Sequence, residues 1–365
     1  MTGASESGST SGDRPRAFAT RTLVLLAAAT ITLAGMKSIA GIIGPIFLAL
    51  VLTVTLHPIR TWLEKKGKLP EWAASVIMLI GAYLLLILLT LALIVSIAQL
   101  AALIPQYADE WQATLSGIQS WLTGLGLSTT DIQTMLQEID PSTIAAFAES
   151  LLSSLSSVVS GTLFTVVLLI FLAVDGTIFP QRMAKARPGH ESAFDGLRTF
   201  ASGTRRYFGV ATIFGGIVAV LDTTALLILG IPAAFLWGLL AFVTNYIPNV
   251  GFIIGLIPPT ILAFLQGGPS LAVTVLIVYC ALNFVIQSVL QPKFVGDAVG
   301  LTTTMSFLSL IIWTFILGPI GAILAIPASL LVKGLLVDID PQARWLQLFL
   351  GDAAVPKDQP AEPTR

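Results

Sequence analysis

The hydrophobic pattern along the chain consists of long apolar runs that carry almost no charge. Between residues 209 and 332 the only formally charged side chains are Asp222, Lys293 and Asp297. A soluble domain of that length needs charged side chains over much of its surface, whereas the hydrocarbon core of a bilayer requires runs of about 20 predominantly apolar residues. The pattern therefore predicts an all-α, polytopic integral membrane protein.

Eight apolar stretches predict about eight transmembrane helices, some of them broken by Pro or Gly. They cover residues 22–36, 39–57, 72–104, 155–174, 209–229, 233–266, 270–290 and 301–332. We expect the first two to fold into a helical hairpin, joined at Lys37-Ser38. The third would measure about 50 Å as a helix, so it must tilt or extend beyond a hydrocarbon core of about 30 Å. The sequence leaves open whether 233–266 and 301–332 are single kinked spans or re-entrant hairpins.

The polar segments divide the chain into five parts. These are a disordered cytoplasmic tail at 1–21, three helices at 22–104, a helical extracytoplasmic insertion at 105–154, five helices at 155–335 that include a basic cytoplasmic loop at 175–208, and a cytoplasmic tail at 336–365. Within the insertion, apolar side chains recur at helical spacing on Tyr107, Trp111, Leu115, Ile118 and Leu122. That spacing predicts an amphipathic helix.

Lysine and arginine are distributed unevenly among the polar segments, which predicts the orientation. Segments 60–71 and 175–208 are basic, whereas 105–150 contains neither lysine nor arginine. Because basic loops stay on the cytoplasmic side, we expect 175–208 inside and the insertion outside. With eight spans, the N- and C-termini are then both cytoplasmic.

Composition excludes several other classes of function. The net charge of −1 gives no reason to expect a nucleic-acid partner. One cysteine, Cys280, and two distant histidines, His57 and His190, supply neither a disulfide nor a metal-binding motif. No nucleophile–base pair is visible, so we expect neither an enzyme nor a bound cofactor or metal.

Two apolar stretches interrupted by Pro and Gly are the first candidates for a substrate or ion pathway. In lipid, a broken helix survives only where it is buried in protein or lines a wet cavity, and paired breaks mark the substrate site of many transporters. The alternative is a plain proline kink that serves packing. The candidate residues at these breaks are Asn245, Pro248, Asn249, Gly251, Gly318 and Pro319.

Polar side chains inside the spans are the second set of candidates. Asn283, Gln287 and Gln291 stand at i, i+4 and i+8, on one face of a helix; they either line a pathway or join helices by hydrogen bonds. Asp222 is the only charged residue between 209 and 290. An acid at membrane depth is a candidate proton carrier or cation ligand, and the alternative is an acid near a helix end that pairs with Lys293.

Several motifs resemble those of one family. Ile247-Pro248-Asn249-Val250-Gly251, followed by IIGLIPP at 253–259, is similar to the P-x-x-G signature of the autoinducer-2 exporter family. QPKFVGDAVGL at 291–301, which contains Gln291, Pro292, Gly296 and Gly300, and GPIGAILAIPASLLVK at 318–333 are also similar to that family. The resemblance implies an eight-span permease of the bacterial inner membrane that forms a homo-oligomer and slides a transport part against a scaffold.

Three functions remain open at this stage. We favour export of a small polar solute, such as a quorum-sensing molecule like autoinducer-2, with amides from Asn245, Asn283 and Gln287 binding hydroxyls and Asp222 coupling movement to protons. The alternative is a monovalent cation (sodium or lithium)/proton antiporter with Asp222 and backbone carbonyls freed at the helix breaks as ligands. The second alternative is a non-transporting membrane scaffold that binds a partner through residues 105–150.

Overall fold

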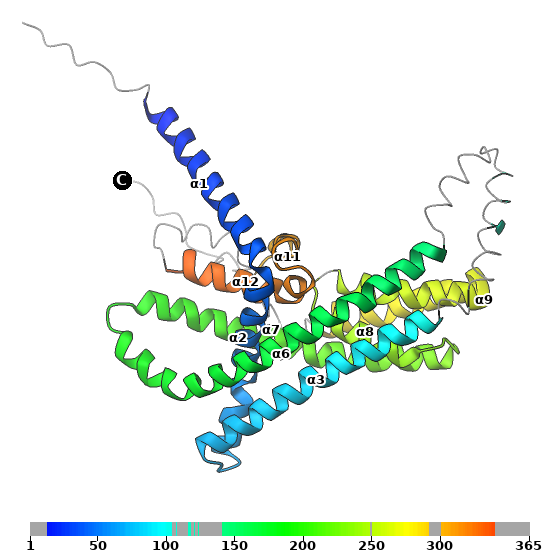
Figure 1. The fold of residues 1–365 in the computed structure, drawn as a ribbon, viewed down its shortest axis with the longest axis horizontal. Coiled ribbons are helices and arrows are strands. Elements are labelled where there is room, and N and C mark those ends of the chain that lie inside the picture. The colour runs from blue at the N-terminus through cyan, green and yellow to red at the C-terminus, as the bar shows by residue number, and fades with distance from the viewer. Residues whose placement is uncertain are drawn as a thin grey trace, which may run out of the picture.

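The computed structural model describes residues 13–103, 141–248, 250–291 and 301–339, together with positions 107, 116, 117, 120 and 123. Every long element in this part of the chain is a helix (Figure 1), which confirms the all-α prediction. The elements are α1 (Asp13–Ser38), α2 (Ala40–Lys65), α3 (Glu71–Leu103), α6 (Pro141–Ala186), α7 (Glu191–Ile228), α8 (Ala234–Thr244), α9 (Gly251–Asn283), the π-helix η2 (Phe284–Leu290), α11 (Thr303–Leu317) and α12 (Pro319–Leu336).

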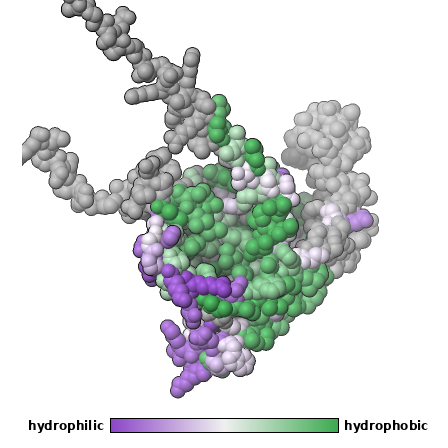
Figure 2. All heavy atoms as spheres, turned by 60° about the vertical axis from the view of Figure 1, so that its left-hand side comes forward, coloured by the Kyte–Doolittle hydropathy of each residue, from purple (hydrophilic) through white to green (hydrophobic). Residues whose placement is uncertain are grey.

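The surface of these helices matches a bilayer and not water. Six segments of the described chain are long and apolar enough to cross a membrane, and α8 and α11 are shorter apolar helices. Large apolar side chains such as Ile228 and Phe235 are 80% and 75% exposed, and apolar side chains cover much of the face seen in Figure 2. Such a surface is stable only in contact with lipid or protein. The chain is a multi-pass membrane protein.

The expected hairpin of the first two helices does not form. Only Ile39 separates α1 from α2, and Figure 1 shows α1 pointing away from the other helices and not folded back along α2. Lys37 and Ser38, read as a turn in the sequence, remain helical, since neither residue breaks a helix as Gly or Pro does. The Lys37 Nζ lies 3.7 Å from the centre of the Phe315 ring, which connects this junction to α11.

The predicted basic loop at 175–208 is also mostly helical. α6 continues to Ala186 and α7 begins at Glu191, so the connection is limited to the Arg-Pro-Gly-His turn at 187–190, where Gly189 has φ of +83°. Charged side chains do not end a helix, whereas Pro lacks a backbone donor and Gly accepts a positive φ. The basic residues of this region therefore lie on two helices.

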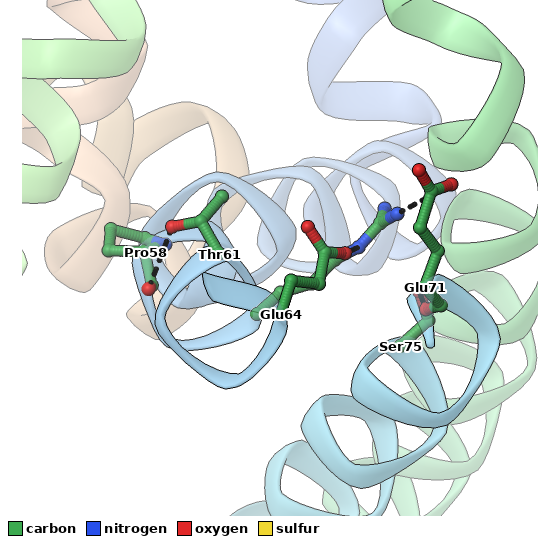
Figure 3. A network of polar contacts seen from close by, with 6 residues as sticks. Pro58, Thr61, Glu64, Glu71 and Ser75 are labelled. Carbon is green, nitrogen blue, oxygen red and sulfur yellow. Dashed lines mark hydrogen bonds and ion pairs between the residues drawn. The ribbon is translucent and has the colours of Figure 1, made fainter. Parts of the chain in front are cut away.

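A buried arginine organises the corner between α2 and α3 (Figure 3). Arg60, whose side chain is 13% exposed, places its Nε 2.7 Å from Glu64 and its Nη2 4.0 Å from Glu71 at the start of α3. Residues 60–65 thus belong to α2 and shorten the predicted loop at 60–72. The predicted start of the third span at 72 is within one residue of α3.

The stretch 233–266 forms a helical hairpin, here called hairpin 1: α8, the turn at 245–250 and residues 251–266 of α9. With 11 residues, α8 is about 16 Å long and cannot cross a core of about 30 Å. Beyond hairpin 1, Gly267 and Gly268 have non-helical backbone angles and divide α9. Residues from both halves of α9, Ala263 and Val275, share one core cluster, so the two halves pack together.

The stretch 301–332 forms hairpin 2, which is α11, Gly318 and α12. Gly318 has φ of +68°, a conformation that favours glycine, and reverses the chain between the two helices. The tip of hairpin 1 packs against hairpin 2: Tyr246 shares a cluster with Leu324, and Ile247 and Val250 lie against Ala322. In Figure 1 the two hairpins extend in opposite directions from this meeting point.

Candidate functional site

A small buried cavity lies between α7, hairpin 1, the second half of α9 and η2. Its volume is about 10 Å³, close to the minimum that holds one water molecule. Polar side chains gather here from segments far apart in the sequence. The lining residues are Val218, Asp222, Ala241, Thr244, Asn245, Phe252, Gly255, Tyr279, Asn283 and Gln287.

Asp222 provides the acid of the cavity from the C-terminal part of α7. Its side chain is 1% exposed, and neither carboxylate oxygen accepts a hydrogen bond from the described residues. The backbone of α8 approaches α7 very closely beside it, because a Cβ added to Gly238 would overlap the Thr223 hydroxyl. This contact brings Ala241 and Thr244 of α8 to the same cavity as Asp222.

Amide side chains form a connected chain along one side of the cavity. Gln287 Nε2 donates to Asn283 Oδ1 (2.9 Å) and to Asn245 Oδ1 (3.2 Å). Asn245 Nδ2 donates to the Ala211 carbonyl of α7 (2.9 Å), and Asn283 Nδ2 donates to the Tyr279 carbonyl (3.0 Å). Asn283 lies beside Asp222, and only one of the two N–H groups of its amide is used within its own helix. The chain fixes the turn of hairpin 1 to α7 and to η2.

Four carbonyls at the turn of hairpin 1, those of Thr244, Tyr246, Ile247 and Pro248, accept hydrogen bonds, contrary to the expectation of free carbonyls. The Thr244, Ile247 and Pro248 carbonyls accept from the amides of Ile247, Gly251 and Val250 respectively. The Tyr246 carbonyl accepts from the Tyr207 hydroxyl at 2.7 Å. Side-chain groups, and not carbonyls of the broken backbone, are therefore the polar groups that the site offers in this conformation.

The predicted site residues fall into four groups. Asp222, Asn245, Asn283 and Gln287 all line the cavity. Pro248 and Gly251 shape the turn without lining the cavity, and a Cβ on Gly251 would overlap the Thr244 carbonyl. Gln291 ends η2, and Gly318 and Pro319 form the turn of hairpin 2, so none of the three lines the cavity. Asn249, Pro292, Gly296 and Gly300 lie outside the described residues.

Tyr279 is the main residue that the sequence reasoning missed. It is 1% exposed, its hydroxyl has no hydrogen-bond partner among the described residues, and it lines the same cavity as Asp222. Tyr279 stands four residues before Asn283, so extending the i, i+4 stripe by one turn would have included it. Thr244 and Gly255 could be found only from the packing of hairpin 1.

The arrangement suits a site that binds one small polar group. A charged carboxylate buried without a countercharge is costly, so Asp222 requires a proton, a cation or a hydrogen-bond donor. The predicted alternative of a pair with Lys293 stays a prediction, because residue 293 lies outside the described part of the chain. Within that part, no group of three or more His, Cys, Asp or Glu could hold a metal ion.

Comparisons with known proteins agree on one family. The sequence profile of the AI-2E family transporters matches residues 23–339. The chain is 28% identical to the AI-2 transport protein TqsA of Escherichia coli K12 over 85% of this chain and 90% of that protein. It is 28% identical to YhhT of the same organism, named as a candidate transport protein, over 85% and 88%. A similarly named protein of Haemophilus influenzae is 29% identical over 91% and 96%.

Proposed function

Because the chain belongs to the AI-2E family, which is a family of transporters and not of enzymes, we propose that it exports a small polar solute across the bacterial inner membrane. The proposed pathway is the cavity around Asp222. The observation that carries the proposal is the meeting of one unpaired acid and three amides from separate elements in a buried cavity. Polar groups are costly at membrane depth, and functional pathways are where they occur.

The proposed solute binds as the cavity opens. A volume of about 10 Å³ is too small for a molecule larger than water, so hairpin 1 must move away from α7 and η2 to admit a solute. Four side-chain hydrogen bonds hold its tip closed: from Asn245 to Ala211, from Gln287 to Asn245, from Tyr207 to Tyr246, and between Tyr246 and Thr212. When these bonds break and hairpin 1 moves, the amides of Asn245, Asn283 and Gln287 become available to bind solute hydroxyls.

The proposed identity of the solute rests on two observations. One relative is named for transport of AI-2, and neutral amides outnumber acids in the cavity. Both facts support a hydroxylated molecule like autoinducer-2. Asp222 would couple the movement to protons, because an acid buried without a countercharge is most stable at membrane depth when it carries a proton.

Monovalent cation/proton antiport is the second candidate, and the size of the cavity favours it. The cavity accommodates a particle of the size of water or of a small cation, next to a carboxylate that has no hydrogen-bond partner among the described residues. In this mechanism sodium or lithium and protons would occupy Asp222 in turn. The non-transporting scaffold is the weakest of the three functions, since the chain belongs to a transporter family.

Two further properties belong to the proposal. We expect a homo-oligomer, because the family resemblance implies one and because many large apolar side chains face outward. We also expect both termini in the cytoplasm, from the distribution of lysine and arginine.

Transport by reconstituted protein tests the proposal and separates its two forms. The purified chain in liposomes is assayed for efflux of an autoinducer-2 furanone and, separately, for proton flux driven by a sodium gradient. We expect furanone efflux whose rate depends on pH in the wild type and is independent of pH in Asp222→Asn. The matched control is Asp195→Asn, which removes an exposed carboxylate 3.9 Å from Arg187 and should behave as the wild type.

Each outcome has a definite meaning. Sodium-driven proton flux without furanone efflux would replace export by antiport. An Asp222→Asn variant with the same pH dependence as the wild type would make Asp222 structural and end the proton-coupled form. Absence of both activities would remove the transport proposal for these solutes.

A further inference from the structure

Two buried polar groups of the cavity have no hydrogen-bond partner among the residues that the structure describes. The two oxygens of the Asp222 carboxylate form no hydrogen bond with the described residues, and the Tyr279 hydroxyl forms none either. Each residue is only 1% exposed. Leaving such groups unpaired is unfavourable, and native proteins satisfy nearly all of them with protein or water. One unsatisfied group is a local compromise, whereas two that line one cavity indicate a shared ligand.

The two groups are complementary and close. Tyr279 lies within electrostatic reach of Asp222, and they are the only titratable residues among those that line the cavity. The phenol can donate one hydrogen bond, and the carboxyl oxygens accept. A group that accepts from Tyr279 and donates to Asp222 would satisfy both at once, which is what an O–H group does and a bare cation does not.

The neighbouring amides complete the description of this ligand. Both N–H groups of Gln287 and one N–H group of Asn283 donate within the protein, while the Gln287 carbonyl oxygen accepts no hydrogen bond from the described residues. The volume of about 10 Å³ limits the occupant to the size of one water molecule. A buried water typically makes about three hydrogen bonds, and this cavity offers at least two strong ones.

We propose that Tyr279 is a ligand-positioning residue that, together with Asp222, holds one water molecule in the closed site. The water occupies the place that a hydroxyl of the transported solute takes over when hairpin 1 opens, a second step that rests on the proposed function. Tyr279 is held rigidly for this role, because its ring packs in a core cluster with Trp237 and Val275. A fixed hydroxyl orients its ligand better than a mobile one.

A double-mutant cycle on thermal unfolding tests the proposal without any transport assay. Asp222→Asn, Tyr279→Phe and the double variant are purified in detergent with choline chloride as the only salt, and their Tm values are compared with the wild type. Both substitutions keep the shape of the side chain. If a water bridges the two groups, Tyr279→Phe should lower Tm by at least about 2 °C, and the effects of the two substitutions should not add.

A matched tyrosine supplies the control. The Tyr83 hydroxyl donates to the Val166 carbonyl at 2.8 Å and lies outside the cavity. Tyr83→Phe should lower Tm because it removes a hydrogen bond, but its effect should add to that of Asp222→Asn.

Three results would overturn the proposal. An unchanged or raised Tm in Tyr279→Phe would show that the hydroxyl was merely unsatisfied, because removing such a group is neutral or stabilising. Additive effects of Tyr279→Phe and Asp222→Asn would show that no ligand joins them. Coupling that appears only when sodium chloride replaces choline chloride would identify the occupant as a cation.

The double-mutant cycle tests the water site, and the liposome assay tests the proposed function, so one proposal can be refuted without the other. Coupling in the cycle without transport in liposomes would leave the water site standing and refute the proposed function. Transport without coupling would refute the role of Tyr279 alone.

Discussion

Hairpins 1 and 2 share one sequence signature and differ in how they satisfy their polar groups. Both are apolar stretches reversed at Pro and Gly, and both were predicted to line the pathway. In hairpin 2 the Trp313 Nε1 donates to Ser329 (2.9 Å), Ser329 donates to Ser309 (2.7 Å), and Ser309 donates to the Met305 carbonyl (2.6 Å). Every member of this chain has its partner inside the hairpin.

In hairpin 1 the polar groups instead point outward, to other elements and to the cavity. Asn245 forms hydrogen bonds with α7 and with η2, and Tyr246 forms hydrogen bonds with Tyr207 and Thr212 of α7. Half of α12 is buried, against 22% of an apolar 18-residue stretch within Gly251–Leu290. The comparison teaches that a broken helix in a membrane protein does not by itself indicate a site. A hairpin that closes its own hydrogen bonds is suited to a structural role, and one that depends on its neighbours is suited to move.

Filling the cavity is expected to have the largest effect on transport. Ala241 of hairpin 1 lines the cavity and is 7% exposed, so the larger side chain of Ala241→Leu would occupy the site and cost about 1–3 kcal/mol of stability. We expect transport in liposomes to fall at least about tenfold, which corresponds to a rise of about 1.4 kcal/mol in the free-energy barrier. Ala281→Leu, on the exposed side of α9, is the matched control, and equal transport by both variants would refute the assignment of the cavity.

Breaking the polar chain of hairpin 2 should affect stability and leave transport unchanged. Ser329→Ala removes the acceptor of Trp313 Nε1, which should lower the free energy of unfolding by about 1–3 kcal/mol. Thermal unfolding and the liposome assay measure the two effects. Ser202→Ala is the control, because Ser202 is exposed and donates only to the Thr199 carbonyl of its own helix. If Ser329→Ala loses transport but keeps full stability, hairpin 2 belongs to the pathway, and the proposed difference between the two hairpins is wrong.

We expect the open ends of the two hairpins to face opposite sides of the membrane. This prediction concerns orientation alone, so it is tested by labelling and not by a transport assay. The base of hairpin 1 is connected to the turn at 229–233 through the bond from Gln266 to the Gly230 carbonyl (3.1 Å). The end of α12 lies against the basic part of α7, where Gly196 contacts Gly334. Since that basic part is predicted to be cytoplasmic, the base of hairpin 1 should be outside.

Single cysteines at Ser270 and Ser192 test this arrangement in a Cys280→Ser background. Both positions are exposed. An impermeant maleimide applied to whole cells should label position 270 and spare position 192, and both should react after the cells are broken. Labelling of 192 alone in whole cells would invert the topology.

The sequence predicted individual helices well where apolar runs were long and uninterrupted. The span predicted at 72–104 is α3 at Glu71–Leu103, because an apolar run in lipid has no alternative to helical hydrogen bonding. Prediction failed at the connections. Charge was taken as the sign of a loop at 175–208, but the helices end at Pro188-Gly189, where the backbone requires it. The amphipathic helix predicted around Trp111 lies outside the described residues.

By itself the sequence determined that the protein is a bundle of membrane helices, and that Asp222, Asn283 and Gln287 are its unusual polar positions, because hydrophobicity and helical spacing are local properties. The tertiary structure alone decided which polar groups meet. Asp222 and Tyr279 are 57 residues apart in the chain, and they line one cavity because close contacts at glycines, such as Gly238 against Thr223, fix how the helices pack. Packing depends on the shapes of many side chains together, and no local pattern contains that information.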